Sequence, residues 1–256
     1  MLREITILGG RKKNGEPEAV QEVTVQVGQV YSIVGFTGSG KSQLINDIEQ
    51  IAQRDSISRR QILLDGEPPL DNALHRYEQN LVAHLSQNMN FILDMKVKEF
   101  LIMHAGCRGF REPGKKAEEV IECANTFAGE AIKPEENLTR LSGGQSRSLM
   151  IADVAINGDS PVVLIDEVEN AGIHRLKAME TLAAQQKIVL VVTHDPLLAL
   201  LGEKRIIMGN GGMQAVLALT QQEVTVRGRL EKMAGVLQGL QDQLRQGESV
   251  SLEFQP

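Results

Sequence analysis

The sequence lacks the features of a membrane-spanning or secreted protein and carries no excess of positive charge. No stretch of its 256 residues approaches the roughly 18–20 consecutive apolar residues that cross a bilayer. Acidic and polar residues interrupt the first ten positions, MLREITILGG, where a signal peptide needs an apolar core. The net charge of −6 argues against a large basic surface for nucleic acid. We therefore expect a cytoplasmic protein with no nucleic acid partner.

Cysteine is also scarce. The two cysteines, Cys107 and Cys123, form no CxxC pair, and no cysteine–histidine cluster has the spacing of metal ligands. We interpret both as reduced thiols of minor structural importance. Hydrophobic residues make up 42% of the chain and charged residues 23%, a composition typical of a folded soluble protein.

The first part of the chain predicts antiparallel strands and then a buried strand. Apolar and polar residues alternate at the start and again from Val20 to Val27, and Asn14-Gly15 between them is typical of a tight turn. Residues 30–34, VYSIV, form a short and mostly apolar run, which predicts a buried strand.

Later segments predict a helical region followed by an α/β region. Between about 88 and 140 the apolar residues recur at helical periods. Two apolar runs, 162–165 and 188–192, then predict buried strands of a parallel sheet. In the tail, apolar residues follow at alternating three- and four-residue steps, as in Leu237, Leu240 and Leu244. This pattern predicts an amphipathic helix that packs either on its own domain or on a partner.

A glycine-rich loop follows the buried strand at 30–34. Residues 35–42, GFTGSGKS, fit the pattern G-x-x-x-x-G-K-S/T, in which backbone N–H groups and a helix N-terminus bind phosphate oxygens. We expect Lys41 to contact the β- and γ-phosphates and Ser42 to bind Mg²⁺. The predicted nucleotide-binding residues of this loop are Gly35, Thr37, Gly38, Ser39, Gly40, Lys41 and Ser42.

Two carboxylates end the apolar run at 162–165. In a layered α/β sheet, ligands bind beyond the carboxyl ends of the strands. Asp166 is therefore expected to hold Mg²⁺, directly or through water. Glu167 is expected to act on the water molecule that attacks the γ-phosphate, either by accepting a proton from that water or by polarising it.

Residues 141–145 read LSGGQ, and with them the sequence resembles a particular family. LSGGQ is the signature of ABC ATPases, and an apolar helical pattern follows it here, so Ser142 is expected at a helix N-terminus, which favours anions. In the family this element contacts the γ-phosphate bound to the opposite subunit. The resemblance therefore implies nucleotide contacts for Ser142, Gly143, Gly144 and Gln145.

Two more family elements match in the same order. Gln87 resembles the Q-loop glutamine, which implies contact with Mg²⁺ or the attacking water and a part in catalysis. His194, in Thr193-His194-Asp195, resembles the switch histidine, which implies a hydrogen bond to the γ-phosphate and a catalytic role. The segment 90–101 resembles the stretch that touches the membrane subunits in transporters.

The resemblance implies an α/β fold of the P-loop NTPase class and ABC type. It has an antiparallel β subdomain, a mixed or parallel core sheet and a helical insertion subdomain. We expect an ABC ATPase domain and a C-terminal tail. Their predicted bounds are 1–220 for the domain, with a core of 1–87 and 145–220 and an insertion of about 88–144, and 221–256 for the tail.

The function implied by the resemblance is ATP binding and hydrolysis by a homodimer or heterodimer of cassettes that encloses two Mg-ATP. The commonest use of such a cassette is as the nucleotide-binding subunit of an ABC transporter. The chain would then sit at the cytoplasmic face of a membrane, against separate transmembrane subunits. The alternative is a soluble cassette that drives cofactor or metallocentre assembly, or activates an enzyme, within a protein complex.

Two stretches depart from the family pattern. Residues 8–14 lack the aromatic side chain that stacks on adenine, and either Arg11 or Lys12 could cover the base, although a solvated turn fits the segment better. Val168–Ile173 replaces the proline and the serine-alanine-leucine-aspartate element of transporters. We expect these changes to affect base selectivity and the coupling between the two sites.

Overall fold

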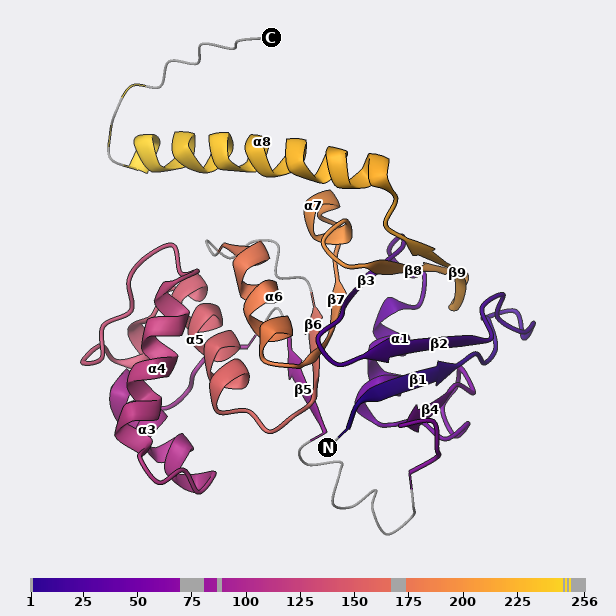
Figure 1. The fold of residues 1–256 in the computed structure, drawn as a ribbon, viewed down its shortest axis with the longest axis horizontal. Helices are drawn as coiled ribbons and strands as arrows, with labels where there is room; N and C mark the ends of the chain where they lie inside the picture. Colours follow the sequence, from indigo (N-terminus) through magenta and orange to yellow (C-terminus); the bar gives the residue numbers. More distant parts are fainter. Residues whose placement is uncertain are drawn as a thin grey trace. The chain divides into compact units, whose positions relative to one another are not determined.

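Figure 1 shows the chain in a computed structural model, which describes residues 2–69, 81–86, 89–166, 174–245, 247 and 249. The chain divides into two compact units, residues 1–218 and residues 219–256. The first unit contains two β-sheets with their helices, and the second contains helix α8.

A three-stranded antiparallel sheet lies in the first unit, with its strands in the order β2–β1–β4. Ile5 pairs with Val25 and Ile7 with Val23, and all four side chains are buried. Because side chains alternate between the two faces of a strand, this register gathers branched apolar side chains on one face. The antiparallel strands predicted near the N-terminus are confirmed. The strands are β1 (Glu4–Leu8), β2 (Glu22–Gln26) and β4 (Gln61–Leu64).

A six-stranded sheet forms the centre of the unit, in the order β5–β6–β7–β3–β8–β9. Its neighbouring strands are parallel except for β9, which runs antiparallel to β8, so the mixed core sheet is confirmed. The strands are β3 (Val30–Val34), β5 (Val82–Leu85), β6 (Val162–Asp166), β7 (Ile188–Val192), β8 (Lys204–Gly209) and β9 (Gly212–Ala218).

The central strands contribute to two hydrophobic cores, one on each face of the sheet. In β6, Val163 and Ile165 join the core that contains the helical insertion. Val162 and Leu164 join the core that contains α1 and the antiparallel sheet. Burial on both faces explains why these strands are continuous apolar runs rather than alternating ones.

The helical insertion predicted between 88 and 140 contains helices that pack as one layer with α5, apart from the antiparallel sheet (Figure 1). In α4 the buried side chains are Ala117, Val120, Ile121 and Ala124, at the spacing of one helix face. The helices among the described residues of the first unit are α1 (Lys41–Glu49), α3 (Val97–Cys107), α4 (Pro113–Asn125), η1 (Leu138–Arg140), α5 (Gly143–Ile156), α6 (Arg175–Ala184) and α7 (Pro196–Ala199).

The second unit contains α8 (Gln221–Arg245), where the sequence predicts a helix. Thr220 and Glu223 form a capping box at its start: Thr220 Oγ1 accepts from the Glu223 N–H at 3.3 Å, and Glu223 Oε2 accepts from the Thr220 N–H at 2.9 Å. Among the described residues, no helix combines the length and the apolar character that crossing a bilayer demands.

A buried cluster of charges ties the first unit together. The Arg60 side chain is fully buried, with Nη1 2.8 Å from Asp47 Oδ2 and Nη2 2.5 Å from Glu18 Oε1. Nη2 also donates to the Gly211 carbonyl at 3.0 Å. Burial raises the pKa of the Glu18 carboxyl, and the charge of Arg60 opposes that rise. Arg60 therefore stabilises two carboxylates that are buried away from solvent.

Replacing Arg60 should destabilise the protein strongly. In Arg60→Met, Asp47 and Glu18 stay buried without their cation, which costs about 3–5 kcal/mol of unfolding free energy. The matched control is Arg59→Met, because Arg59 is the exposed neighbour and its loss should change stability by about 0.5 kcal/mol or less. Urea denaturation of the three proteins measures the difference. Equal stability of the two variants would contradict this account of the cluster.

Candidate functional site

The glycine-rich loop leaves the end of β3 and enters α1. Gly38 has φ 77° and Gly40 has φ 101°, in the left-handed region that glycine adopts without strain. A Cβ at Gly40 would also lie 2.8 Å from Gly211 Cα. The Gly211 N–H donates to the Ser39 carbonyl at 2.9 Å, so the β8–β9 turn fixes the back of the loop.

Lys41 folds over this loop from the first residue of α1. Its Nζ donates to the Gly35 carbonyl at 2.8 Å and to the Phe36 carbonyl at 3.3 Å. The residue is only 8% exposed, so its ammonium group is held against the loop backbone and not in bulk water. The positive end of α1 begins at the same residue, which adds to the local attraction for an anion.

A cavity of about 440 Å³ opens beside the loop. It brings together side chains from three strand ends: the loop after β3, Asp166 at the end of β6 and His194 after β7. These strands are parallel neighbours, with β7 between β3 and β6, which is why their carboxyl ends meet at one edge. Its lining residues are Lys13, Thr37, Gly38, Gly40, Lys41, Ser42, Gln43, Asp166, Val192 and His194.

The turn that carries His194 is fixed on both sides. The Asp195 N–H donates to Thr193 Oγ1 at 2.9 Å, and Asp195 Oδ1 accepts from the Leu197 N–H at 2.7 Å as the cap of α7. Asp195 Oδ2 is also 2.5 Å from Arg175 Nη1 of α6. Thr193 is buried while His194 is exposed at the cavity. These contacts therefore fix the backbone of the turn from which the His194 imidazole extends.

The residues of the LSGGQ segment lie elsewhere. Ser142 caps α5: its Oγ accepts from the Gln145 N–H at 3.3 Å, and Gln145 Oε1 accepts from the Ser142 N–H at 2.9 Å. Gln145 Nε2 also donates to the Ala131 carbonyl at 3.2 Å, and the residue is 7% exposed. The Gln145 side chain is thus occupied in holding the helix start. Ser142 and Gly143 are exposed and are not among the described residues that line the cavity.

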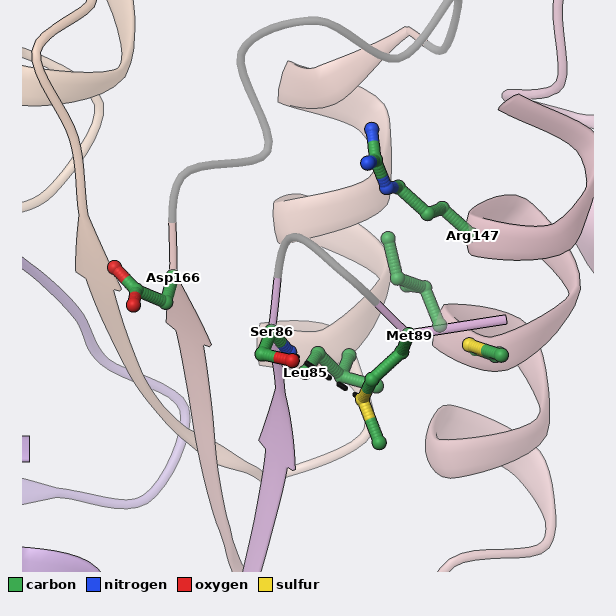
Figure 2. A pocket seen from close by; sticks show the side chains of 7 residues that line it. Leu85, Ser86, Met89, Arg147 and Asp166 are labelled. Atoms are coloured by element: carbon green, nitrogen blue, oxygen red, sulfur yellow. Dashed lines mark hydrogen bonds between the residues drawn. The ribbon is translucent and has the colours of Figure 1, made fainter. Parts of the chain in front are cut away.

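Two predicted site residues, Gln87 and Glu167, lie outside the described residues. The residues before them are described: Ser86 follows β5, and Asp166 ends the neighbouring strand β6. A small pocket lies between these strand ends and α5 (Figure 2). In it the Ser86 N–H donates to Met89 Sδ at 3.3 Å, while the Asp166 carboxylate points away from Leu85 and Met89.

Three residues that line the cavity were not predicted from the sequence: Lys13, Gln43 and Val192. The stretch 8–14 suggested Arg11 or Lys12 as cover for a base, but Arg11 Nη1 donates to the Gly15 carbonyl at 2.8 Å and Lys12 pairs with Glu16 at 3.4 Å. Lys13 reaches the cavity instead, with Nζ 2.7 Å from the Gly38 carbonyl. The only available signal was its place next to the Asn14-Gly15 turn.

The architecture and the site together define a class of protein. A glycine-rich loop and an acidic residue share one edge of a parallel sheet, and a separate helical layer presents a serine-glycine helix start. This is the arrangement of an ATP-binding cassette. Within the described part of the chain, no Phe, Tyr or Trp side chain lines the cavity.

Comparison with known proteins gives the family. The sequence pattern of the ABC transporter family matches residues 20–170, so the chain belongs to this family. It is 53% identical over 253 residues to the uncharacterized ABC transporter ATP-binding protein MJ0121 of Methanocaldococcus jannaschii, a match that covers 98% of the chain and 96% of the relative. It is 24% identical to the methionine import ATP-binding protein MetN of Streptococcus agalactiae, of which it covers 54%.

Solved structures agree on the fold. The dimeric ATP-binding cassette MJ0796, in a post-hydrolysis state with ADP and Pi, superposes with a TM-score of 0.61 at 24% identity, covering 84% of the chain and 99% of that structure. The protein cbiO1 from Clostridium perfringens, part of the ABC transporter complex cbiONQ, superposes with a TM-score of 0.64 at 19% identity, covering 93% and 99%. The chain is an ABC-type ATPase, which binds and hydrolyses ATP.

Proposed function

We propose that the chain is the nucleotide-binding subunit of an ABC transporter and hydrolyses Mg-ATP between two cassettes. One observation carries this proposal: Lys41, Ser42, Asp166 and His194 converge on one cavity, while the exposed helix start at Ser142 does not line it. A site divided in this way is completed by a second cassette. The ABC ATPase domain is proposed to span 1–220, with a tail at 221–256.

The phosphate end of the nucleotide is proposed to bind at the glycine-rich loop. The backbone N–H groups of residues 35–42 and the Lys41 ammonium would contact the β- and γ-phosphates. Ser42 and Asp166 line the same cavity and offer oxygen ligands, which suit Mg²⁺ when substrate phosphates complete its coordination. Gln87 is proposed as a further oxygen ligand. The metal would neutralise charge on the phosphates.

The residues around the γ-phosphate are proposed to promote attack by water. Glu167 would accept or polarise the proton of that water, and Gln87 and His194 would orient the water and the γ-phosphate. His194 stands on the fixed turn between Thr193 and Asp195, which supports a positioning role. Phosphoryl transfer needs little covalent help, so positioning and charge stabilisation supply most of the rate.

A second cassette, in a homodimer or heterodimer, would close the site. Helix α5 has its N-terminus at Gly143, and Ser142 and Gly143 are exposed, so these groups and Gly144 can approach a phosphate on another subunit. Gln145 would act through the capping box that sets this geometry. The similar cassette MJ0796 is described as a dimer bound to ADP and Pi.

An exposed apolar surface supports a membrane-subunit partner at the cytoplasmic face. Ile92 is 90% exposed, and Leu93 and Met103 are 44% and 45% exposed. The Phe91 ring packs on Phe100 of α3 at 5.2 Å, and Met103 follows Phe100 by one helical turn, so the segment and α3 present one surface. The similar protein cbiO1 is described as part of a transporter complex, and this favours separate transmembrane subunits over a soluble assembly complex.

Replacing Glu167 should separate ATP binding from hydrolysis. Glu167→Gln keeps the size of the side chain but removes its basic carboxylate, so turnover should fall by about 10²–10⁴-fold. ATP should still bind and hold two cassettes together, because its γ-phosphate is not cleaved and can contact both subunits. Phosphate release measures turnover, and light scattering with Mg-ATP should give twice the monomer mass.

The matched control is Glu122→Gln, which changes an exposed carboxylate on α4 and should leave both quantities unchanged. Wild-type turnover by Glu167→Gln would refute the role of Glu167. A variant that binds ATP without hydrolysing it and remains monomeric would refute the shared site.

The membrane-subunit surface can be tested separately. Ile92→Glu places a charge in the proposed interface and should reduce recovery of the protein with membranes by about tenfold or more, while ATP hydrolysis by the isolated cassette is kept. Ile57→Glu is the matched control, because Ile57 is 92% exposed in the loop between α1 and β4. Fractionation of cells measures recovery. Recovery of the wild-type protein only in soluble complexes would refute the proposal that it serves a transporter.

A further inference from the structure

The side chains of three consecutive basic residues, Arg11, Lys12 and Lys13, each contact a different group within the chain. Arg11 donates to the Gly15 carbonyl within the same turn, and Lys12 pairs with Glu16 on the surface. Lys13 Nζ lies 2.7 Å from the Gly38 carbonyl. Of the three, Lys13 is the residue that lines the nucleotide cavity.

The position of Lys13 is set by its neighbours. Its N–H donates to the Asn210 carbonyl at 3.0 Å, which fixes its backbone on the β8–β9 turn. A Cβ at Gly211 would lie 2.6 Å from Lys13 Cγ, so the glycine leaves room for the lysine stem. The Gly211 N–H in turn holds the Ser39 carbonyl. The same turn therefore positions both the phosphate loop and Lys13.

The environment of Lys13 suits a polyanion. Lys13 and Lys41 place two ammonium groups on one loop, at the carbonyls of Gly38 and Gly35. Asp166 is the one carboxylate among the described residues that line this cavity. An ammonium group has three N–H donors, so Lys13 can keep its bond to Gly38 and donate to a phosphate oxygen as well.

We propose that Lys13 binds the phosphate chain of the nucleotide directly, as a second cation beside Lys41. This inference rests on the proposed binding of the triphosphate at residues 35–42. The phosphates, and not the base, receive this contact, so its contribution is the same for any nucleoside triphosphate. A charge-assisted hydrogen bond of this kind strengthens binding about tenfold.

The test compares Lys13→Gln with Lys12→Gln, whose side chain pairs with Glu16 and does not line the cavity. Calorimetry measures the Kd of each protein for ATP, GTP and inorganic tripolyphosphate, all with Mg²⁺. Lys13→Gln should weaken the binding of all three ligands by a common factor of about tenfold. Added salt should reduce the affinity of Lys13→Gln less than it reduces that of the wild type. Lys12→Gln should match wild type, and thermal melting confirms that both variants fold.

Three results would overturn the inference while leaving nucleotide binding intact: unchanged affinities in Lys13→Gln, a loss for ATP and GTP but not for tripolyphosphate, or an equal loss in Lys12→Gln. The second would assign Lys13 to the ribose or base, and the third would reflect diffuse surface charge. Wild-type protein that binds none of the three ligands would instead refute the proposed site itself, and the inference with it.

Discussion

The buried guanidinium of Arg60 is the interaction on which the nucleotide site depends. It joins the segment before β4 to Glu18 of the first hairpin, to Asp47 of α1 and to Gly211 of the β8–β9 turn. Asp47 also accepts from Ser58 Oγ at 2.7 Å. Gly211 in turn donates its N–H to the Ser39 carbonyl of the glycine-rich loop. These contacts therefore fix the conformation of the loop in the absence of a ligand. A preorganised loop loses less entropy on binding.

The central sheet supplies the second constraint. Strands β6 and β7 send alternate side chains into two cores of different composition, so a slip by one residue would exchange side chains between the cores and disrupt the close packing of both. The register therefore holds Asp166 beside Val192, and with it the place of His194 after β7. Packing far from the proposed phosphate site in this way sets the geometry of the residues that line it.

Local signals predicted much of this structure from the sequence, and long-range contacts explain the rest. The phosphate loop, the strand before Asp166 and the helix start at Ser142 each occupy a short continuous segment, so a pattern of a few residues reveals them. Arg60 and Gly211 are 151 positions apart, and no pattern links them. The direction of the Lys13 side chain depends on the β8–β9 turn in the same way. The capping box of Gln145 with Ser142 is local and matches the pattern S-x-x-Q, whereas its bond to the Ala131 carbonyl, 14 positions away, has no such signature.

In the proposed dimer, each nucleotide site takes its loop from one cassette and its serine-glycine helix start from another. Mixing two inactive variants tests it directly: Lys41→Ala lacks the loop cation, while Ser142→Asp keeps a capping residue but repels phosphate. Random pairing gives half mixed dimers, each with one intact site, so the mixture should recover up to about a quarter of wild-type ATPase activity. A mixture no more active than its separate components would mean that the two cassettes do not share their sites.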